Sequence, residues 1–226
     1  MRRRAAATSV LAGSLRRHDL REPARRLLEK LEVSLAANTD RLSVPGDRGT
    51  LIVANHISWL DIVAALAVEP TAFLAKHDVR RWPVIGSLAA RHGTVFVDRH
   101  EMRRLPQVVA GLAGALRSGR SVVVFPEGTT WCGRCGQGVF RRAAFQAAID
   151  AGAPIRPVTL EYDQGGEPST AAAFVGDDPL LASLGRVTRA RDLRIRLTAQ
   201  PAFAADGDRR ELAARARKCI SQASYV

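Results

Sequence analysis

The chain has 226 residues, 46% of them hydrophobic, which is enough for the core of one domain. Its 34 Lys and Arg residues outnumber its 22 Asp and Glu residues, and the net charge of +12 favours an anionic partner such as nucleic acid, an anionic membrane surface or a phosphorylated substrate. Three cysteines exclude a disulfide framework and favour a reducing, cytosolic setting, and no run of about 20 apolar residues predicts a membrane-spanning helix.

Residues 1–43 are predicted to form a basic helical segment. Arg and Leu residues recur along it, and Pro23 either breaks it or starts its second helix. Such a segment binds an anionic membrane surface through its arginines, or it packs on the core and leaves them in solvent. The sequence favours neither interpretation. We therefore separate residues 1–43, a candidate membrane contact, from a domain at residues 44–226, and expect peripheral attachment at the cytoplasmic face of the cell membrane.

From Thr50 onward, strand-like and helix-like runs alternate. The strand-like runs are residues 51–54, 72–75, 94–97, 121–125, 155–161 and 193–199. The helix-like runs are residues 61–68, 83–91, 105–118, 141–151 and 209–221. Residues 163–170, rich in Gly, Pro and polar side chains, predict a surface loop. The alternation predicts a single α/β domain with a mostly parallel or mixed sheet flanked by helices.

Polar side chains follow four of the predicted strands closely. They are His56, Lys76, Arg99 and Glu127. Ligands of open α/β sheets bind at the carboxyl ends of the strands. We therefore expect these four positions to converge on one edge of the sheet and to form a site there.

His56 and Asp61 lie where the first of these strands meets a helix. A histidine exchanges its proton near neutral pH, and a nearby carboxylate fixes its tautomer and raises its basicity. The pair therefore indicates activation of a hydroxyl group. Taken alone, the two residues favour a helix-capping aspartate beside a structural histidine, so the pair needs further residues to become a catalytic site.

Arg99 and the turn after residues 121–125 indicate anion binding. A guanidinium binds phosphate in a bidentate manner. Gly128 allows the backbone to approach a ligand, and the Thr129 hydroxyl and backbone N–H groups bind oxygen anions. Taken singly, a solvated surface arginine and an ordinary turn account for them.

Pro154 and Pro157 flank a short apolar piece at the start of a later strand. Two prolines restrict the chain and can shape a pocket wall, although ordinary strand entry has the same appearance.

Together these elements resemble the glycerolipid acyltransferase family, in particular its PlsC-like lysophosphatidic acid acyltransferases. Four blocks of that family occur here in order. They are His-x4-Asp at His56 and Asp61, Gly-x-x-Phe-x-x-Arg at Gly93, Phe96 and Arg99, Phe-Pro-Glu-Gly-Thr at residues 125–129, and Pro-Ile-x-Pro-Val at residues 154–158. The resemblance covers about residues 48–162. The combination is specific, although each block alone is not.

The resemblance implies an O-acyltransferase that moves a fatty acyl group from acyl-CoA or acyl-carrier protein to the hydroxyl of a lysophospholipid. The leading acceptor is 1-acyl-sn-glycerol 3-phosphate, which becomes phosphatidic acid, and another lyso-lipid such as lyso-ornithine lipid is the alternative. His56 would deprotonate the hydroxyl, and Asp61 would hold the imidazole. The acceptor's phosphate would be bound by Arg99, Glu127, Gly128 and Thr129.

Further positions receive roles from the same resemblance. Lys76 would supply a second phosphate-binding cation. The residues that would shape the pocket are Gly93, Phe96, Pro126, Trp131, Pro154 and Pro157. A thioester reacts with a positioned alkoxide and a stabilised oxyanion. We therefore expect no metal site and no cofactor beyond the thioester co-substrate.

Two other functions deserve comparison. The run Trp131-Cys132-Gly133-Arg134-Cys135 resembles the thioredoxin redox motif and would make the chain a thiol–disulfide oxidoreductase, but the following helix is predicted to start only near Phe140. The net charge of +12 also fits a nucleic-acid binder. Because the chain has no recognised binding motif and few aromatic residues among its arginines, we expect no nucleic-acid partner.

Overall fold

The computed structural model describes residues 20–76, 94–97, 102–133 and 138–223. The helices in these ranges are α2 (Arg21–Leu31), α3 (Leu60–Val68), the 3₁₀ turn η2 (Met102–Arg104), α5 (Leu105–Arg117), α6 (Ala143–Ala151), α7 (Leu180–Val187) and α8 (Arg209–Ala223). The strands are β1 (Ser34–Ala37), β2 (Leu51–Ala54), β3 (Ala72–Lys76), β4 (Val95–Val97), β5 (Val122–Val124), β6 (Ile155–Gln164), β7 (Glu167–Pro168) and β8 (Leu193–Ala199).

The described strands form one mixed sheet in the order β1-β8-β6-β2-β5-β3-β4, and β7 pairs with the end of β6. Strand β2 lies parallel to both β5 and β6, and β3 lies parallel to both β5 and β4. Only the pairings of β6 with β8 and with β7 are antiparallel among these strands. The predicted single α/β domain with a mixed sheet is therefore confirmed.

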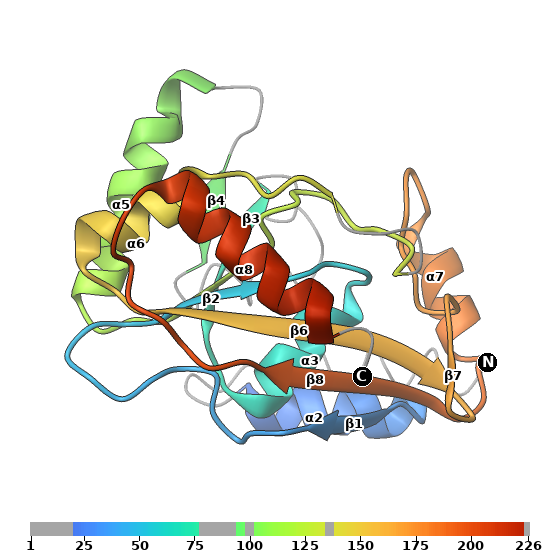
Figure 1. The fold of residues 1–226 in the computed structure, drawn as a ribbon. Coiled ribbons are helices and arrows are strands. Elements are labelled where there is room, and N and C mark those ends of the chain that lie inside the picture. The colour runs from blue at the N-terminus through green and yellow to red at the C-terminus, as the bar shows by residue number, and fades with distance from the viewer. Residues whose placement is uncertain (1–19, 77–93, 98–101, 134–137, 224–226) are drawn as a thin grey trace.

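Helices cover both faces of the sheet (Figure 1). The helices α2 and α3 pack on one face, and α5, α6 and α8 pack on the other. The face under α2 and α3 forms a first hydrophobic core, and the face under α5, α6 and α8 forms a second. Along β2, Ile52 and Ala54 belong to the first core, and Leu51 and Val53 belong to the second. A strand that is buried on both faces is apolar throughout, which explains the continuous run at residues 51–54.

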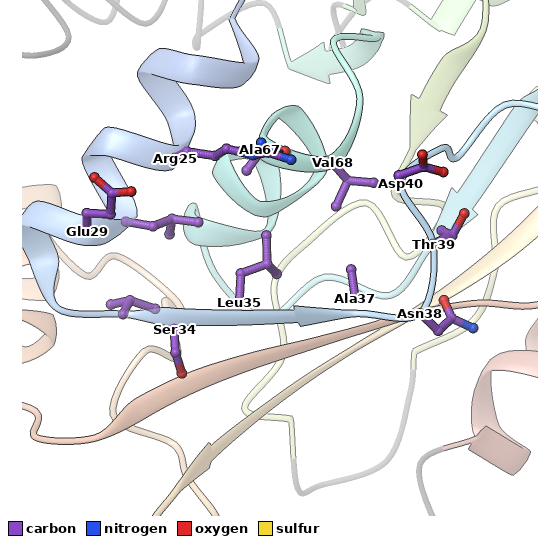
Figure 2. A pocket seen from close by; sticks show the side chains of 12 residues that line it. Arg25, Glu29, Ser34, Leu35, Ala37, Asn38, Thr39, Asp40, Ala67 and Val68 are labelled. Atoms are coloured by element: carbon purple, nitrogen blue, oxygen red, sulfur yellow. Dashed lines mark hydrogen bonds between the residues drawn. The ribbon is translucent and has the colours of Figure 1, made fainter.

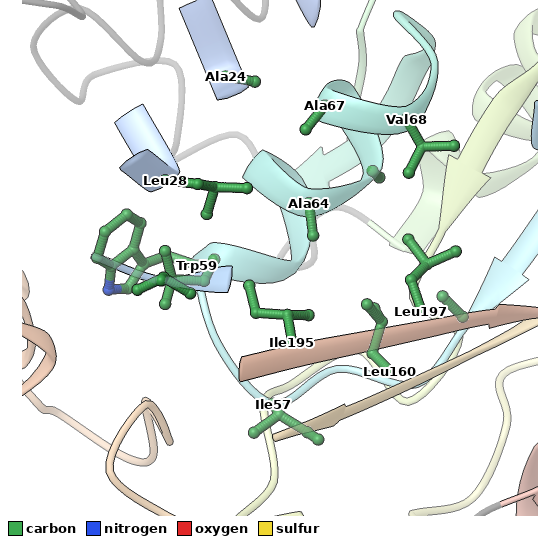
Figure 3. Packing of buried hydrophobic residues seen from close by; sticks show 14 of the residues in the cluster. Ala24, Leu28, Ile57, Trp59, Ala64, Ala67, Val68, Leu160, Ile195 and Leu197 are labelled. Carbon is green, nitrogen blue, oxygen red and sulfur yellow. The ribbon is translucent and has the colours of Figure 1, made fainter. Parts of the chain in front are cut away.

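Figure 3 shows the first core at α3. Ala64 and Val68 of this helix lie on the side of the strands, toward Ile195 and Leu197 of β8 and Leu160 of β6, and Ala67 lies on the side of α2. Small alanines let the helix lie close to the sheet. This packing fixes the first turn of α3 at the carboxyl end of β2.

The N-terminal segment differs from its prediction. Helix α2 ends at Leu31, and β1 then pairs in parallel with β8, although the whole of residues 1–43 was expected to be helical. Pairing with a neighbouring strand overrides the weak local preference of these residues for a helix. The sequence of residues 34–37 alone therefore does not predict strand β1. Leu27, Leu28 and Leu31 are buried in the first core. Residues 20–43 thus pack with the rest of the domain.

Two further elements were not predicted. Residues 163–170 were expected to form a loop, but β6 continues to Gln164 and turns back through Gly165 and Gly166 into β7. Both glycines have positive φ angles, 60° and 91°, which a tight turn requires. Helix α7 was also missed. The helix expected at residues 83–91 lies outside the described residues.

Candidate active site

The carboxyl ends of neighbouring parallel strands bring several predicted residues to one edge of the sheet. His56 follows β2, and Glu127 follows the adjacent β5. Lys76 is the last residue of β3, paired with Val97 of β4, and its side chain lies outside what the structure describes. Gly93 and Arg99 also lie outside the described residues. Phe96 is in β4, and only its backbone is described.

His56 and Asp61 form a hydrogen-bonded pair. The His56 Nδ1 atom lies 2.7 Å from Asp61 Oδ2. Because a carboxylate only accepts hydrogen bonds, Nδ1 carries the proton and Nε2 is left as the proton acceptor. His56 is partly exposed, whereas Asp61 is fully buried. The pair thus has a solvent-accessible base and a buried carboxylate that orients it.

The Asp61 carboxylate has four hydrogen-bond donors. Oδ2 accepts from the backbone N–H groups of Ile57 at 2.7 Å and Ser58 at 2.9 Å, in addition to His56. Oδ1 accepts from the Tyr162 hydroxyl at 2.5 Å. Asp61 also lies in the first turn of α3, where the helix dipole favours a negative charge. These donors replace the hydration that the carboxylate loses on burial.

Asn55 joins the loop between β2 and α3, residues 55–59 (the histidine loop), to β6 in place of a further strand pair. Its side-chain amide donates to Leu160 O, and its carbonyl oxygen accepts from Leu160 N, both at 2.8 Å. The backbone pairing of β2 with β6 ends one residue earlier, at Ala54. This two-way contact ends the strand and holds the next residue, His56, at the sheet edge.

The imidazole of His56 lies against the ring of Phe125. The two ring centroids are 4.0 Å apart and the planes differ by 13°, which is a stacked arrangement. Phe73 of β3 supports Phe125 from a centroid distance of 6.4 Å. Trp131 N–H donates to His56 O at 2.8 Å. Stacking and this backbone contact restrict the orientation of the imidazole.

Glu127 braces two loops of the site. Its Oε2 accepts from His56 N–H at 2.9 Å, and its Oε1 accepts from Gly138 N–H at 3.0 Å. Burial raises the pKa of this carboxyl, and the two backbone N–H groups and His56 oppose the rise. Both oxygens are therefore engaged with the protein. The expectation that Glu127 assists phosphate binding stays a prediction.

The turn after β5 presents Thr129 to solvent. Gly128 N–H donates to Phe125 O at 3.0 Å, and Gly128 has a φ of 75°, a conformation that favours glycine. Pro126 and Gly128 are buried, and Thr129 is exposed. Thr129 is therefore accessible to solvent, whereas the Thr130 hydroxyl donates to Phe174 O.

The remaining pocket-shaping residues divide into two groups. The Trp131 ring lies so close to Gly138 that a Cβ there would meet it at 2.6 Å. Trp131 is also next to His56, because its backbone N–H donates to His56 O. Pro154 lies at the opposite end of β6, where its carbonyl accepts from Leu51 N–H, and Pro157 lies beside Val53 within the sheet. The structure does not bring these two prolines to His56.

A separate hollow of about 710 Å³ lies between α2, β1 and the end of α3 (Figure 2). Arg25 crosses it and donates to Ala67 O at 3.0 Å. Ala67 is at the opposite end of α3 from Asp61. We therefore assign the candidate active site to the sheet edge that carries His56.

Comparisons with known proteins agree with this assignment. The sequence profile of the Acyltransferase family matches residues 30–161. The chain belongs to this acyltransferase family. It is 38% identical to a lyso-ornithine lipid O-acyltransferase of Pseudomonas aeruginosa over 77% of this chain and 67% of that protein. It is 36% identical to a 1-acyl-sn-glycerol-3-phosphate acyltransferase of Neisseria meningitidis, over 78% of this chain and 68% of that protein.

A solved structure shares the fold. The 1-acyl-sn-glycerophosphate acyltransferase PlsC of Thermotoga maritima aligns with a TM-score of 0.64 at 20% identity, and the match covers 98% of this chain and 79% of that one. None of these matches supports the thiol–disulfide oxidoreductase alternative. Cys135, the second cysteine of that alternative, lies outside the described residues. None of the described helices is long and apolar enough to cross a membrane.

Proposed function

We propose that this acyltransferase moves a fatty acyl group from a thioester, acyl-CoA or acyl-carrier protein, to the hydroxyl of 1-acyl-sn-glycerol 3-phosphate. The 2.7 Å hydrogen bond from His56 Nδ1 to Asp61 Oδ2 carries the proposal, because it leaves Nε2 as a base at a ligand-accessible edge. Family membership and the names of the Neisseria and Pseudomonas relatives support a lyso-lipid acceptor.

The reaction follows from the position of the pair. His56 Nε2 takes the proton of the acceptor hydroxyl, and the oxygen attacks the thioester carbonyl. The tetrahedral intermediate collapses, the carbon–sulfur bond breaks, and the imidazolium returns its proton to the leaving thiolate. The products are an ester and a free thiol. Asp61 stabilises the imidazolium that exists between the two proton transfers.

The acceptor's phosphate would lie along the same sheet edge. Thr129 is exposed there, Gly128 shapes the turn, and β3 and β4 end at Lys76 and Val97. Arg99, two positions after Val97, would pair with the phosphate. A chain with a net charge of +12 is drawn to anionic lipid, so we place the reaction at the cytoplasmic surface of the membrane, without a metal or a cofactor.

The direct test is product analysis by mass spectrometry with purified full-length protein. Both thioester donors are offered with a panel of lyso-lipid acceptors. We expect phosphatidic acid from the wild type and a loss of roughly 10²–10⁴ in kcat for His56→Ala, the range expected for a general base. The control is His18→Ala, a histidine that precedes the four blocks in the sequence and belongs to none of them. Undiminished transfer by His56→Ala would contradict the mechanism.

A lyso-ornithine lipid is the second candidate acceptor, because the Pseudomonas relative carries that name at 38% identity. Lyso-ornithine lipid has no phosphate, so the two acceptors predict different effects of Arg99→Ala. With lysophosphatidate as the true acceptor, KM should rise at least about 10-fold, because a charged hydrogen bond is lost. Arg103 is an exposed arginine in η2, and Arg103→Ala should leave this KM unchanged. Efficient acylation of lyso-ornithine lipid that is insensitive to Arg99→Ala would favour the second candidate.

A further inference from the structure

Tyr162 lies outside the four blocks but reaches the centre of the site. Its hydroxyl donates to Asp61 Oδ1 at 2.5 Å, across 101 positions of sequence. Asp61 Oδ2 is the atom that holds His56. The two oxygens of the Asp61 carboxylate thus have different partners. Oδ2 orients the base His56, and Oδ1 is held by Tyr162 of β6.

The alternation of β6 explains why the tyrosine faces this carboxylate. Val158, Leu160 and Tyr162 join the core on the α3 side of the sheet. Thr159 points to the other face, where its hydroxyl donates to Ile220 O of α8 at 3.3 Å. A residue at position 162 therefore meets the first turn of α3, where Asp61 lies.

Ser58 completes the surroundings of the hydroxyl. The Ser58 side chain is fully buried. Burial, followed by the charge of Asp61, raises the pKa of Tyr162 well above its ordinary value of 10.0, and Ser58 lowers this pKa slightly. Tyr162 therefore remains a neutral donor throughout the working pH range.

We propose that Tyr162 is a positioning residue for the acyl transfer, which holds the Asp61 carboxylate so that Oδ2 stays on His56 Nδ1 and which shares part of the carboxylate's negative charge. The inference rests on the proposed function, since it assigns Tyr162 a task in that reaction. Tyr162 touches neither substrate nor the reacting nitrogen. It acts through Asp61.

The first test compares Tyr162→Phe with Thr159→Val. Both remove a buried hydroxyl from β6, but only the first one faces Asp61. Loss of a hydrogen bond to a charged group should lower kcat about 10- to 100-fold in Tyr162→Phe, with KM for both substrates nearly unchanged. Without the tyrosine hydroxyl, the Asp61 carboxylate keeps its full negative charge and stabilises the His56 imidazolium more strongly. The acidic limb of the kcat/KM profile of Tyr162→Phe should therefore move to higher pH. Thr159→Val should leave the limb in place.

The second test strengthens the donor. Tyr162 and Tyr225 are the two tyrosines of the chain, so fluorotyrosine incorporated into a Tyr225→Phe background changes Tyr162 alone. A more acidic phenol takes more of the carboxylate charge, and the acidic limb should move to lower pH, opposite to Tyr162→Phe. Glu127, the other described titratable group that contacts His56, is kept in every variant. This test also stands if Tyr162→Phe does not fold.

A readout that does not need turnover separates the two proposals. The Nδ1–H proton of His56, observed by NMR, should shift in Tyr162→Phe and remain in place in Thr159→Val. If the wild type acylates no lyso-lipid but this shift is seen, the proposed function fails and the positioning role stands. If the wild type is active and Tyr162→Phe keeps its kcat, its pH limb and its Nδ1–H signal, the positioning role is overturned.

Discussion

At the scale of single residues, the buried Glu127 connects two backbone segments of the site. It joins the loop after β2 to the segment at Gly138 through two backbone N–H groups. A carboxylate has two equivalent acceptors for these donors, whereas an amide has one acceptor and one donor. The geometry therefore requires an acid at this position, independently of any contact with a ligand.

Glu127→Gln should release one of the two loops. The amide NH₂ would face a backbone N–H, and the unsatisfied donor should lower kcat about 10-fold with little change in KM. Steady-state kinetics measures this, with Glu29→Gln on the exposed face of α2 as the control. A rise in KM for the phosphate-bearing acceptor at unchanged kcat would instead show that Glu127 works in acceptor binding.

The raised pKa of Glu127 also predicts a pH dependence of stability. The folded state holds this proton more tightly than the unfolded state, whose carboxyl titrates near 4.5. The stability of the wild type relative to Glu127→Gln should therefore be greatest below pH 4.5 and fall as pH rises through the higher folded value. Urea unfolding of both proteins across this range measures the difference. A difference that grows with pH would have the wrong sign.

At the element scale, the start of β2 depends on a close backbone approach. Gly49 N–H donates to Leu116 O at 2.8 Å at the end of α5. A Cβ built on Gly49 would lie 2.0 Å from Arg120 O, so no side chain fits there. This contact sets where β2 begins, and hence where it delivers His56.

Gly49→Ala should destabilise the fold. Two backbone segments would have to separate, at a cost of about 1–3 kcal/mol typical of overpacking. Gly111→Ala in α5 is the matched control, because its Cβ would meet nothing within 4 Å and alanine favours a helix. The midpoints of urea unfolding should therefore move in opposite directions. Equal midpoints for Gly49→Ala and the wild type would refute the close approach.

At the scale of the whole molecule, the basic N-terminal segment and the domain have to be tested separately. Deletion of residues 1–43 would remove α2 and β1, whose residues belong to the core and the sheet. The loss of membrane binding would then be confused with unfolding. Substitutions in residues 2–4, which carry three consecutive arginines, avoid this problem.

Replacement of residues 2–4 by alanine should weaken binding to vesicles that contain phosphatidylglycerol, with about 1 kcal/mol lost per arginine near the surface. Co-sedimentation at two salt concentrations measures this, since screening reduces the effect. The control changes the exposed residues Arg209, Arg210 and Lys218 of α8, which removes the same number of charges from the domain. Equal losses in both variants would assign the binding to net charge alone.

Local features of the sequence predicted the chemistry and much of the fold. The run at residues 51–54 is apolar because the strand is covered on both faces. The position of His56 just beyond the strand can be read directly from the order of residues in the sequence. Strand β8 was predicted with its observed bounds. Its side chains are alternately buried and exposed, so hydrophobic residues recur at every second position of the sequence. Strand β1 was missed because it depends on pairing with β8, which no local pattern records.

The sequence by itself predicted, through its resemblance to the glycerolipid acyltransferases, that His56 and Asp61 carry the acyl transfer, because the partner blocks follow them in order. Only the tertiary structure decided what holds them. Tyr162 reaches Asp61, and Asn55 reaches Leu160, across more than a hundred positions, and Phe125 stacks on His56 from just beyond the end of β5. Such contacts arise because parallel strands bring their carboxyl ends to one edge, and this proximity depends on strand order rather than on spacing along the chain.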